Sequence, residues 1–259
     1  MTNESSEKTG IKKAIAVMSG KGGVGKSTIT GWIAVELNKR GFKVGILDGD
    51  ITGPSIPKLF GVGAKKPYQS EEGLFPVETA TGIKIMSLNL LIDSEDSPVI
   101  WRGPLLANTV KQFYTDVVWG DLDYLLVDLP PGTGDVPLTV MQSFPVDGMV
   151  IVSSPQDLVH MIVKKSVNMV KKLDLPILGV IENMSYLECP GCKKLINVFG
   201  ASDIEEVTKG IGVDLLGKLP IDPEMAELCD EGRLEVYGAI NGSMKDIVDR
   251  IEGKLGGER

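Results

Sequence analysis

Residues 20 to 27 have the composition of a loop that can cradle phosphate groups. They read Gly-Lys-Gly-Gly-Val-Gly-Lys-Ser and match the pattern G-x-x-x-x-G-K-[ST]. The glycines of such a loop let several backbone N–H groups point at phosphate oxygens, and the helix that follows adds the partial positive charge of its N-terminus. Lys26 would bridge the β- and γ-phosphates, and the Ser27 hydroxyl would bind Mg²⁺. The predicted nucleotide contacts are Gly20, Lys21, Gly22, Gly23, Val24, Gly25, Lys26, Ser27 and Thr28.

Acidic residues directly follow two apolar segments that we predict to be strands. Asp48 and Asp50 follow Ile46-Leu47, and Asp128 follows Leu125-Leu126-Val127. A carboxylate at the carboxyl end of a strand lies where the phosphates must lie. It could orient the attacking water or hold Mg²⁺, directly or through a water, as Asp128 would in a Walker B site. For Asp48 two interpretations remain: it supports the site as a second acid, or it is only a residue of the turn.

The segment from Leu129 to Asp135 reads Leu-Pro-Pro-Gly-Thr-Gly-Asp and comes directly after Asp128. Its glycines would let a backbone N–H, such as that of Gly132, approach the γ-phosphate and withdraw when that group leaves. We therefore predict a switch loop, with a purely structural turn as the alternative.

Two of the three cysteines, Cys189 and Cys192, form a C-x-x-C pair. Thiolates suit iron–sulfur clusters, Zn²⁺ or Cu(I), and cluster and zinc sites usually have four ligands. Because one chain offers two thiols at chelating spacing, a second chain related by a two-fold axis would complete the set. We favour a shared [4Fe–4S] cluster, and a zinc ion, a thiol–disulfide switch or an inert turn are the alternatives. Cys229 is expected to be a buried apolar residue, and His160 a surface or satisfied polar group.

The elements that must position these residues are short β-branched runs bounded by Gly, Pro or Asp, with helical patterns between them. This alternation predicts an α/β fold with a mostly parallel sheet and helices on both faces. The predicted strands lie at 15–17, 44–47, 125–127, 149–152 and 177–181. The predicted helices lie at about 27–40, 103–118, 156–172, 223–231 and 244–255.

The 259 residues show no internal repeat or low-complexity linker, which favours one domain over residues 11–259 after a disordered polar tail over residues 1–10. A formal charge of −8 argues against a protein that coats nucleic acid. The sequence has neither a signal peptide nor an apolar run that could span a membrane, so we expect a cytoplasmic protein.

Lys21 makes the phosphate loop resemble the deviant Walker A motif of the class that includes MinD, ParA and the nitrogenase iron protein. Four further motifs and the C-x-x-C pair resemble the Mrp/ApbC family of iron–sulfur cluster carrier ATPases. The motifs cover about residues 14 to 225 and departures lie near the cysteines, where Gly191 replaces the usual His and Gly200-Ala201-Ser202 replaces a glycine-rich segment. The four motifs are residues 48–57, Trp101-Arg102-Gly103-Pro104, residues 128–135 and Glu182-Asn183-Met184-Ser185.

This resemblance implies an ATP-hydrolysing homodimer in which Lys21 reaches nucleotide phosphates across the interface and Asp50 positions the attacking water. It also implies that Asn183 reads the adenine base, with Pro220 and Asp222 nearby. The implied partners are a cluster assembly scaffold as donor and apo iron–sulfur proteins as recipients, without nucleic acid or membrane.

The main alternative is a positioning ATPase similar to MinD or ParA. The segment from Met244 to Glu252 is amphipathic but balanced by acids and lacks aromatic residues, so we expect it to pack on the core instead of on a membrane. An electron donor similar to the nitrogenase iron protein is disfavoured because no cysteine lies between Asp128 and Phe144.

Overall fold

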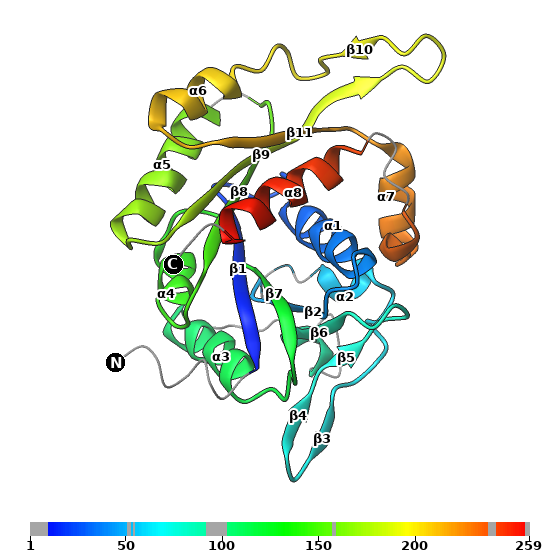
Figure 1. Ribbon diagram of the computed structural model, residues 1–259, viewed down its shortest axis with the longest axis vertical. Coiled ribbons are helices and arrows are strands. Elements are labelled where there is room, and N and C mark those ends of the chain that lie inside the picture. The colour runs from blue at the N-terminus through cyan, green and yellow to red at the C-terminus, as the bar shows by residue number, and fades with distance from the viewer. Residues whose placement is uncertain are drawn as a thin grey trace.

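A central sheet is covered on both faces by helices (Figure 1). The computed structural model describes residues 10–50, 53, 55–91, 103–156, 159–237 and 242–256. Residues 1–9 of the expected tail lie outside these ranges, as do Ile51, Thr52 and Pro54 of the acidic motif and the pair Trp101-Arg102.

Within the described residues, nine strands form one sheet in the order β10-β9-β8-β1-β7-β2-β6-β5, with β11 also paired to β9. The pairs β10–β9 and β5–β6 are antiparallel, and the others are parallel. The predicted mostly parallel sheet is therefore confirmed. The strands are β1 Ile11–Ser19, β2 Val44–Asp48, β5 Val77–Glu78, β6 Lys84–Ser87, β7 Leu122–Asp128, β8 Gly148–Ser153, β9 Ile177–Glu188, β10 Leu195–Ile196 and β11 Leu215–Pro220. A separate hairpin pairs β3 Tyr68–Ser70 with β4 Gly73–Phe75.

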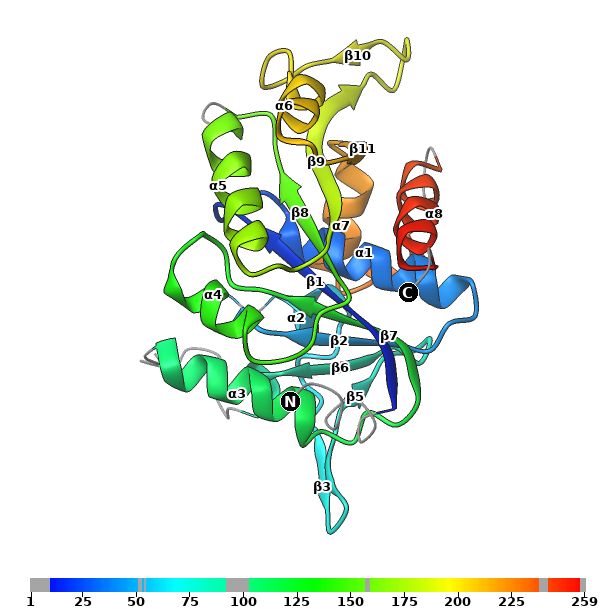
Figure 2. The same cartoon turned by 60° about the vertical axis from the view of Figure 1, so that its left-hand side comes forward.

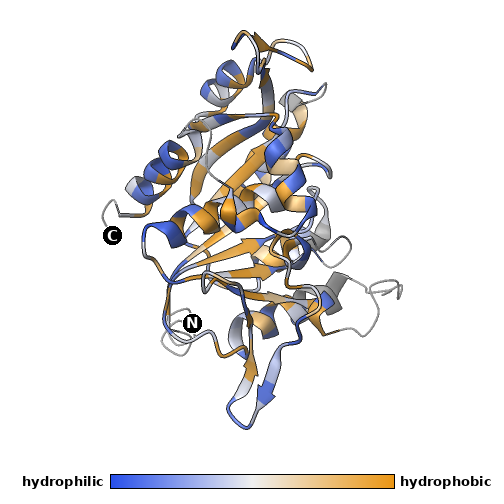
Figure 3. Ribbon diagram, turned by 90° about the vertical axis from the view of Figure 1, so that its right-hand side faces the viewer, coloured by the Kyte–Doolittle hydropathy of each residue, from blue (hydrophilic) through white to orange (hydrophobic). Residues whose placement is uncertain are grey.

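The helices divide between the two faces of the sheet. Figure 2 shows α3, α4 and α5 on one side and α1 and α8 on the other. Each face has its own apolar core, to which Ile33 and Ile247 contribute on one side and Val140 and Val167 on the other. Figure 3 shows these hydrophobic strands between helices with hydrophilic outer surfaces. The helices are α1 Lys26–Lys39, α2 Ile56–Leu59, α3 Gly103–Thr115, α4 Asp135–Met141, α5 Val159–Lys172, α6 Ile204–Ile211, α7 Pro223–Asp230 and α8 Ser243–Gly256, with 3₁₀ turns η1 Leu88–Leu90 and η2 Leu234–Val236.

The predicted helices are confirmed, with shifts at some ends. Gly41 stops α1 as expected, since it takes φ 89° and its N–H donates to the Asn38 carbonyl at 2.9 Å. The predicted helix to residue 118 ends at Thr115, because Val117 and Trp119 turn into the core. The helix predicted from Gln156 is described from Val159.

Strand register brings the predicted site residues to one edge of the sheet. Asp48 lies directly opposite Asp128 on neighbouring strands β2 and β7, and Val17 of β1 lies opposite Asp128 on its other side. Because β1, β2 and β7 are parallel, their carboxyl ends lie side by side. The loop at residues 20–25 follows β1 at this same edge.

Candidate functional site

The phosphate loop connects β1 to α1 and lines a cavity of about 230 Å³. Gly23 and Gly25 take φ values of 79° and 80°, a region that side chains with a Cβ rarely enter. The cavity also contacts Asp50, Gly53, Ser55 and Pro131, so it joins the loop to both acidic segments. The loop residues that line it are Gly22, Gly23, Gly25, Lys26, Ser27 and Thr28, together with Ser19.

Asp128 receives three side-chain donors at the base of this cavity. The Lys26 ammonium lies 2.8 Å from its Oδ2, the Ser27 hydroxyl donates to the same oxygen at 2.5 Å, and the Thr30 hydroxyl donates to Oδ1 at 2.8 Å. Asp128 is fully buried and Lys26 is 6 % exposed. The carboxylate therefore holds the loop lysine and serine in place, and its charge balances that of Lys26.

Asp48 and Asp50 differ in environment although one residue separates them. Burial, and then the nearby negative charge of Asp128, raise the pKa of the Asp48 carboxyl well above its usual value. Asp48 accepts from the Asp50 backbone N–H at 3.1 Å and from the Ser87 hydroxyl at 3.2 Å. Asp50 instead faces the cavity, with Oδ2 3.7 Å from Lys26 Nζ. Asp48 thus supports the β2 end, and Asp50 is the acid with access to a ligand.

Lys21 and Gly132 lie at the rim of the loop. Lys21 Nζ donates to Gln156 Oε1 of the same chain. The Gly132 N–H donates to the Ser19 carbonyl at 2.8 Å, which places the segment after Asp128 directly beside the end of β1.

Asn183 connects the phosphate loop to strand β9. Its side-chain amide donates to the Val24 carbonyl at 2.9 Å, and a Cβ at Gly25 would lie only 2.3 Å from that amide nitrogen. The glycine is therefore needed both for its positive φ and for this close approach. The adjacent Met184 takes φ 56°, an uncommon value for a residue with a side chain.

Pro220 and Asp222 do not line the phosphate-loop cavity. They line a separate cavity of about 210 Å³ beside the cysteines, with Leu187, Pro190 and Lys193. The Asp222 carboxylate caps α7 by accepting from the Glu224 N–H at 2.9 Å, and it also accepts from the Tyr237 hydroxyl. Its hydrogen bonds therefore cap the start of α7 and connect it to Tyr237.

Cys189 and Cys192 lie on the turn between β9 and β10, which projects from the end of the sheet (Figure 1). The Cys189 N–H donates to the Lys194 carbonyl at 3.0 Å, and the Lys193 N–H donates to the Cys189 carbonyl at 2.9 Å. Backbone N–H groups of Cys192 and Gly191 lower the pKa of the Cys189 thiol, and the charge of Lys193 lowers it further. Cys192 is exposed, so a metal could reach the pair from solvent.

Cys229 lies on the buried face of α7, and burial raises the pKa of its thiol. This confirms the expectation of an apolar role. His160 lies on α5, where the position of its side chain is outside the described part. Across the described residues, no group of three or more His, Cys, Asp or Glu side chains could hold a metal ion.

Glu182 is a buried carboxylate that sequence reasoning placed only within a motif. It accepts from the Ser185 hydroxyl at 2.5 Å and from the Ser202 hydroxyl. Ser185 lies before the cysteine hairpin and Ser202 lies after it. Glu182 therefore connects the two ends of the hairpin through these hydrogen bonds. No local pattern signals this contact, because 20 residues separate the partners.

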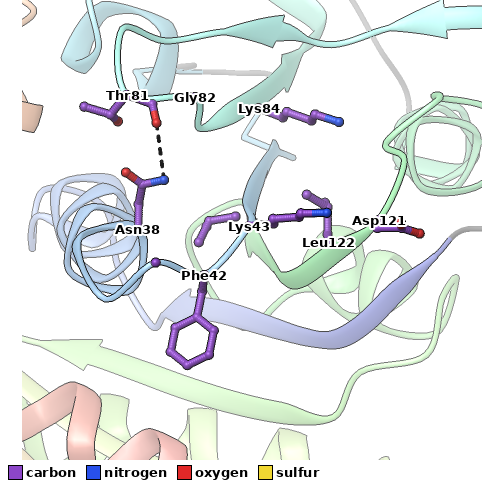
Figure 4. Close-up of a pocket in the computed structure, with 10 residues that line it drawn as sticks. Asn38, Phe42, Lys43, Thr81, Gly82, Lys84, Asp121 and Leu122 are labelled. Atoms are coloured by element: carbon purple, nitrogen blue, oxygen red, sulfur yellow. Dashed lines mark hydrogen bonds between the residues drawn. The ribbon is translucent and has the colours of Figure 1, made fainter.

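Another cavity, of about 480 Å³, lies at the opposite edge of the sheet and is not part of this site (Figure 4). Val44 and Leu122, which line it, begin the strands that Asp48 and Asp128 end. Figure 4 shows Asn38 donating to the Thr81 carbonyl, at 3.5 Å, across one side of it.

The glycine-rich loop, the acids at adjoining strand ends and the mostly parallel sheet define the chain as a P-loop nucleotide-binding protein. Solved structures agree on the fold: MinD from Aquifex aeolicus has a TM-score of 0.67 at 21 % identity, covering 95 % of this chain and 98 % of that one. The chain belongs to the ParA family described as the NUBPL iron-transfer P-loop NTPases, whose profile matches residues 10–255. The resemblance stated from the motifs is therefore confirmed.

Other relatives have a higher sequence identity to this chain than MinD has. The iron–sulfur cluster carrier protein of Methanocaldococcus jannaschii is 48 % identical, over 94 % of this chain and 87 % of its own length. The cytosolic Fe-S cluster assembly factor CFD1 of Saccharomyces cerevisiae is 43 % identical, over 85 % and 78 %. The structure of a nucleotide-binding protein from Archaeoglobus fulgidus in complex with ADP has a TM-score of 0.79 at 46 % identity, covering 88 % of this chain and 90 % of that one.

Proposed function

We propose that this chain is an ATP-dependent carrier that binds an iron–sulfur cluster between two copies of itself and transfers it to apo-proteins. The observation that carries the proposal is the ligand count. Cys189 and Cys192 share one solvent-accessible turn, and no third ligand joins them among the residues that the structure describes. Two chains supply the four thiolates that a [4Fe–4S] cluster needs.

The phosphate-loop cavity suits ATP and Mg²⁺. The loop N–H groups and Lys26 bind the phosphates, and we assign the base contact to Asn183, whose amide donates to the Val24 carbonyl of the loop. The Ser27 hydroxyl and the Asp128 carboxylate lie 2.5 Å apart, an oxygen donor pair suited to Mg²⁺, with Asp50 nearby. When bound, Mg²⁺ neutralises charge that develops on the phosphates. Asp50 orients the attacking water, and turnover is slow.

The positioning ATPase is the less favoured function because of α8. Its apolar residues Met244, Ile247, Val248 and Ile251 are buried against the core, as the sequence predicted.

No helix in the described parts of the chain is long and apolar enough to cross a bilayer. Since the yeast relative is named as a cytosolic factor, we propose the same compartment for this chain.

Anaerobic reconstitution with iron and sulfide tests the carrier function. Wild-type protein should reach about four iron and four sulfide per dimer. Cys189→Ser and Cys192→Ser should lose the cluster, and Cys229→Ser is the matched control that keeps it. Zinc instead of iron in freshly purified protein would favour a zinc site, and a Cys189→Ser/Cys192→Ser protein that still delivers a cluster would overturn the proposal.

ATP hydrolysis is tested separately. Asp50→Asn should bind ATP with nearly wild-type affinity but lose turnover, because only the step that positions water is changed. Lys26→Met should weaken binding itself. Asp50→Asn protein that hydrolyses ATP at the wild-type rate would contradict the role given to Asp50.

A further inference from the structure

A cavity of about 560 Å³ lies between α4 and α5, apart from the cavities described above. The segment after Asp128 and α4 form one wall, which includes Thr133 and Leu138, and α5 forms the other, which includes Lys165 and Lys172. None of the described residues that line it is acidic. Figures 1 and 2 both show α4 and α5 as neighbours on one face of the sheet. The cavity is therefore a positively charged hollow on a helical face.

Helix α5 has a charge opposite to that of the chain as a whole. Its sequence contains four lysines and neither Asp nor Glu, whereas the chain has a formal charge of −8. No ion pair between described residues involves any of these lysines. The four, all exposed, are Lys164, Lys165, Lys171 and Lys172. Their charge is therefore uncompensated within the described part of the chain.

Lys165 and Lys172 lie on one side of α5, because seven residues make about two helical turns. Their backbones are about 10 Å apart at the rise of an α-helix. Asn168 and Met169 lie between them and line the same cavity, and Leu138 lines it from α4. These five residues are here called the α4–α5 surface. It presents two cations at the ends of a partly apolar centre, in which Leu138 and Met169 are half-buried.

This pattern fits a protein segment better than a small anion. Carboxylates about 10 Å apart on an acidic segment pair with the two lysines, and an apolar side chain between them covers Leu138 and Met169. An inorganic anion would pair with a lysine but leave these apolar residues exposed. Charge complementarity of this kind determines which partner associates and how fast.

Helix α6 connects the α4–α5 surface to the cysteine hairpin. It begins at Ile204, directly after the end of the hairpin at Ser202, and Lys171 of α5 donates to the Ile211 carbonyl at its other end, at 2.9 Å. Ile204 also shares an apolar core with Val167 of α5. Figures 1 and 2 both show α6 between α5 and the hairpin. A protein that covers α5 can therefore extend across α6 toward the cysteines.

The α4–α5 surface also adjoins the segment that we predict to be a switch loop. Thr133 and Gly134 line the cavity. Gly132, in the same segment, donates to the carbonyl of Ser19, the last residue before the phosphate loop, at 2.8 Å. A molecule in the cavity therefore touches the segment that would respond to the γ-phosphate. Binding of that molecule and the nucleotide state are then linked.

We propose that the α4–α5 surface docks an acidic segment of the protein that receives the cluster. This inference rests on the proposed carrier function and names the chemistry by which the recipient is recognised. It assigns docking to the body of the chain, separate from ligation by Cys189 and Cys192.

The first test measures binding of a fluorescently labelled acidic apo-ferredoxin to cluster-free, full-length protein by anisotropy. Lys165→Glu and Lys172→Glu should each weaken binding by at least about fivefold, and Lys165→Gln should weaken it less. Raising the ionic strength from about 0.05 M to about 0.5 M should weaken wild-type binding and reduce these differences. Lys245→Glu is the matched control, because Lys245 is an exposed lysine of α8, on the other face of the sheet.

The second test measures cluster transfer from anaerobically reconstituted protein. Lys165→Glu/Lys172→Glu should raise the apo-ferredoxin concentration that gives half-maximal transfer, while the iron content and the rate at saturating apo-ferredoxin stay near the wild-type values. Circular dichroism and ATP affinity should be unchanged. Wild-type affinity for the ferredoxin should differ by at least about threefold between ADP and a non-hydrolysable ATP analogue, and equal affinities would exclude the link to the nucleotide.

The outcomes separate this inference from the proposed function. If the charge-reversed variants bind and load the ferredoxin as wild type does, the lysines form a solvated face, and the proposal is overturned while the carrier function stands. Loss of ATP-dependent dimerisation in these variants would assign the surface to a second copy and also overturn it. Displacement of the ferredoxin by inorganic phosphate at constant ionic strength would indicate a small-anion site instead. If wild-type protein takes up no cluster, the carrier function itself fails.

Discussion

Two buried carboxylates, Asp48 and Asp128, lie opposite each other on neighbouring strands, and they are stabilised unequally. Asp128 has Lys26, Ser27 and Thr30 as donors. Asp48 has one backbone N–H and the Ser87 hydroxyl, and its pKa is raised by burial and by the charge of Asp128. Asp128 is therefore the better stabilised of the two carboxylates, and burial disfavours the charged form of Asp48.

Asp48→Asn should stabilise the metal-free protein increasingly as pH rises. Because the folded-state pKa of Asp48 lies above its unfolded value, the native state binds this proton more tightly, and stability falls as pH rises above about 4. Asparagine removes that loss, so the difference in melting temperature between variant and wild type should grow from pH 4 to pH 7.

Asp123→Asn is a control of opposite sign, because a hydrogen bond from Lys12 lowers the pKa of Asp123. Its stabilising contribution is present at neutral pH and is lost as pH falls below about 4. Asp123→Asn should therefore cost stability at pH 7, by at most about 1 kcal/mol at this exposed pair, and nothing in acid. Parallel melting curves for Asp48→Asn and wild type across pH would contradict the assignment.

The cysteines should differ in their reactivity. In reduced protein with a chelator present, iodoacetamide should alkylate Cys189 with a pH midpoint below that of a free thiol, because Cys192 and Gly191 lower the pKa of Cys189. Cys229 should stay unmodified until the protein unfolds, since it is buried and its pKa is raised. Peptide mass spectrometry measures both rates. In a Cys192→Ala variant, which removes the hydrogen bond from the Cys192 side chain, the Cys189 midpoint should rise; an unchanged midpoint would exclude that contribution.

At the scale of elements, the phosphate loop packs closely against β9. Gly25 combines φ 80° with a close approach to the Asn183 amide. Gly25→Ala should therefore lower the free energy of unfolding by at least about 1–2 kcal/mol and weaken nucleotide binding. Urea denaturation measures the first effect and calorimetric titration with ADP the second.

Gly22→Ala is the control within the same loop, since a Cβ there would meet nothing within 4 Å. Its free energy of unfolding should stay within about 0.5 kcal/mol of wild type. Equal stability of the Gly25→Ala and Gly22→Ala proteins would show that the packing against Asn183 contributes little.

Elements with a strong apolar pattern could be predicted from the sequence, and weakly patterned ones could not. The predicted strand at 177–181 continues to Glu188, although residues 182–188 are largely polar, because β11 and β10 pair with this extension. β10 itself has two residues and no local pattern. The C-x-x-C spacing was enough to identify the two candidate ligands. The hairpin that carries them could not be predicted, because it depends on the pairing of β10 with β9.

At the scale of the whole molecule, the order of strands in the sheet determines which site residues lie next to each other. The spacing of these residues in the sequence does not specify the strand order. The position of Asp48 beside Asp128 depends on β2 and β7 being neighbours, although 80 positions separate these two residues in the chain. The phosphate-loop residues and Asp50 could be predicted because each lies at a strand end. The positions of Pro220 and Asp222 beside the cysteines could be seen only in the structure.

Assembly of two copies would depend on Lys21. If Lys21 reaches the phosphates of a second copy, it must exchange its contact with Gln156 for that nucleotide. Lys21→Ala should then leave nucleotide binding by the monomer nearly intact but reduce ATP-dependent dimerisation and turnover. Light scattering with a non-hydrolysable ATP analogue measures dimerisation. Lys12→Ala, at the opposite edge of the sheet, is the control, and wild-type dimerisation and turnover in Lys21→Ala would return Lys21 to the role of a solvated loop residue.

Strand β9 connects the phosphate loop to the cysteine turn. It carries Asn183, which is bonded to the phosphate loop, and leads directly into Cys189. Six residues of extended strand span about 20 Å. At physiological ionic strength, charges separated through solvent are screened within about 8 Å. A change in phosphate charge is therefore attenuated through solvent before it reaches the thiolates, and we propose that any effect of hydrolysis on the cysteine turn is transmitted by the strand that both ends share.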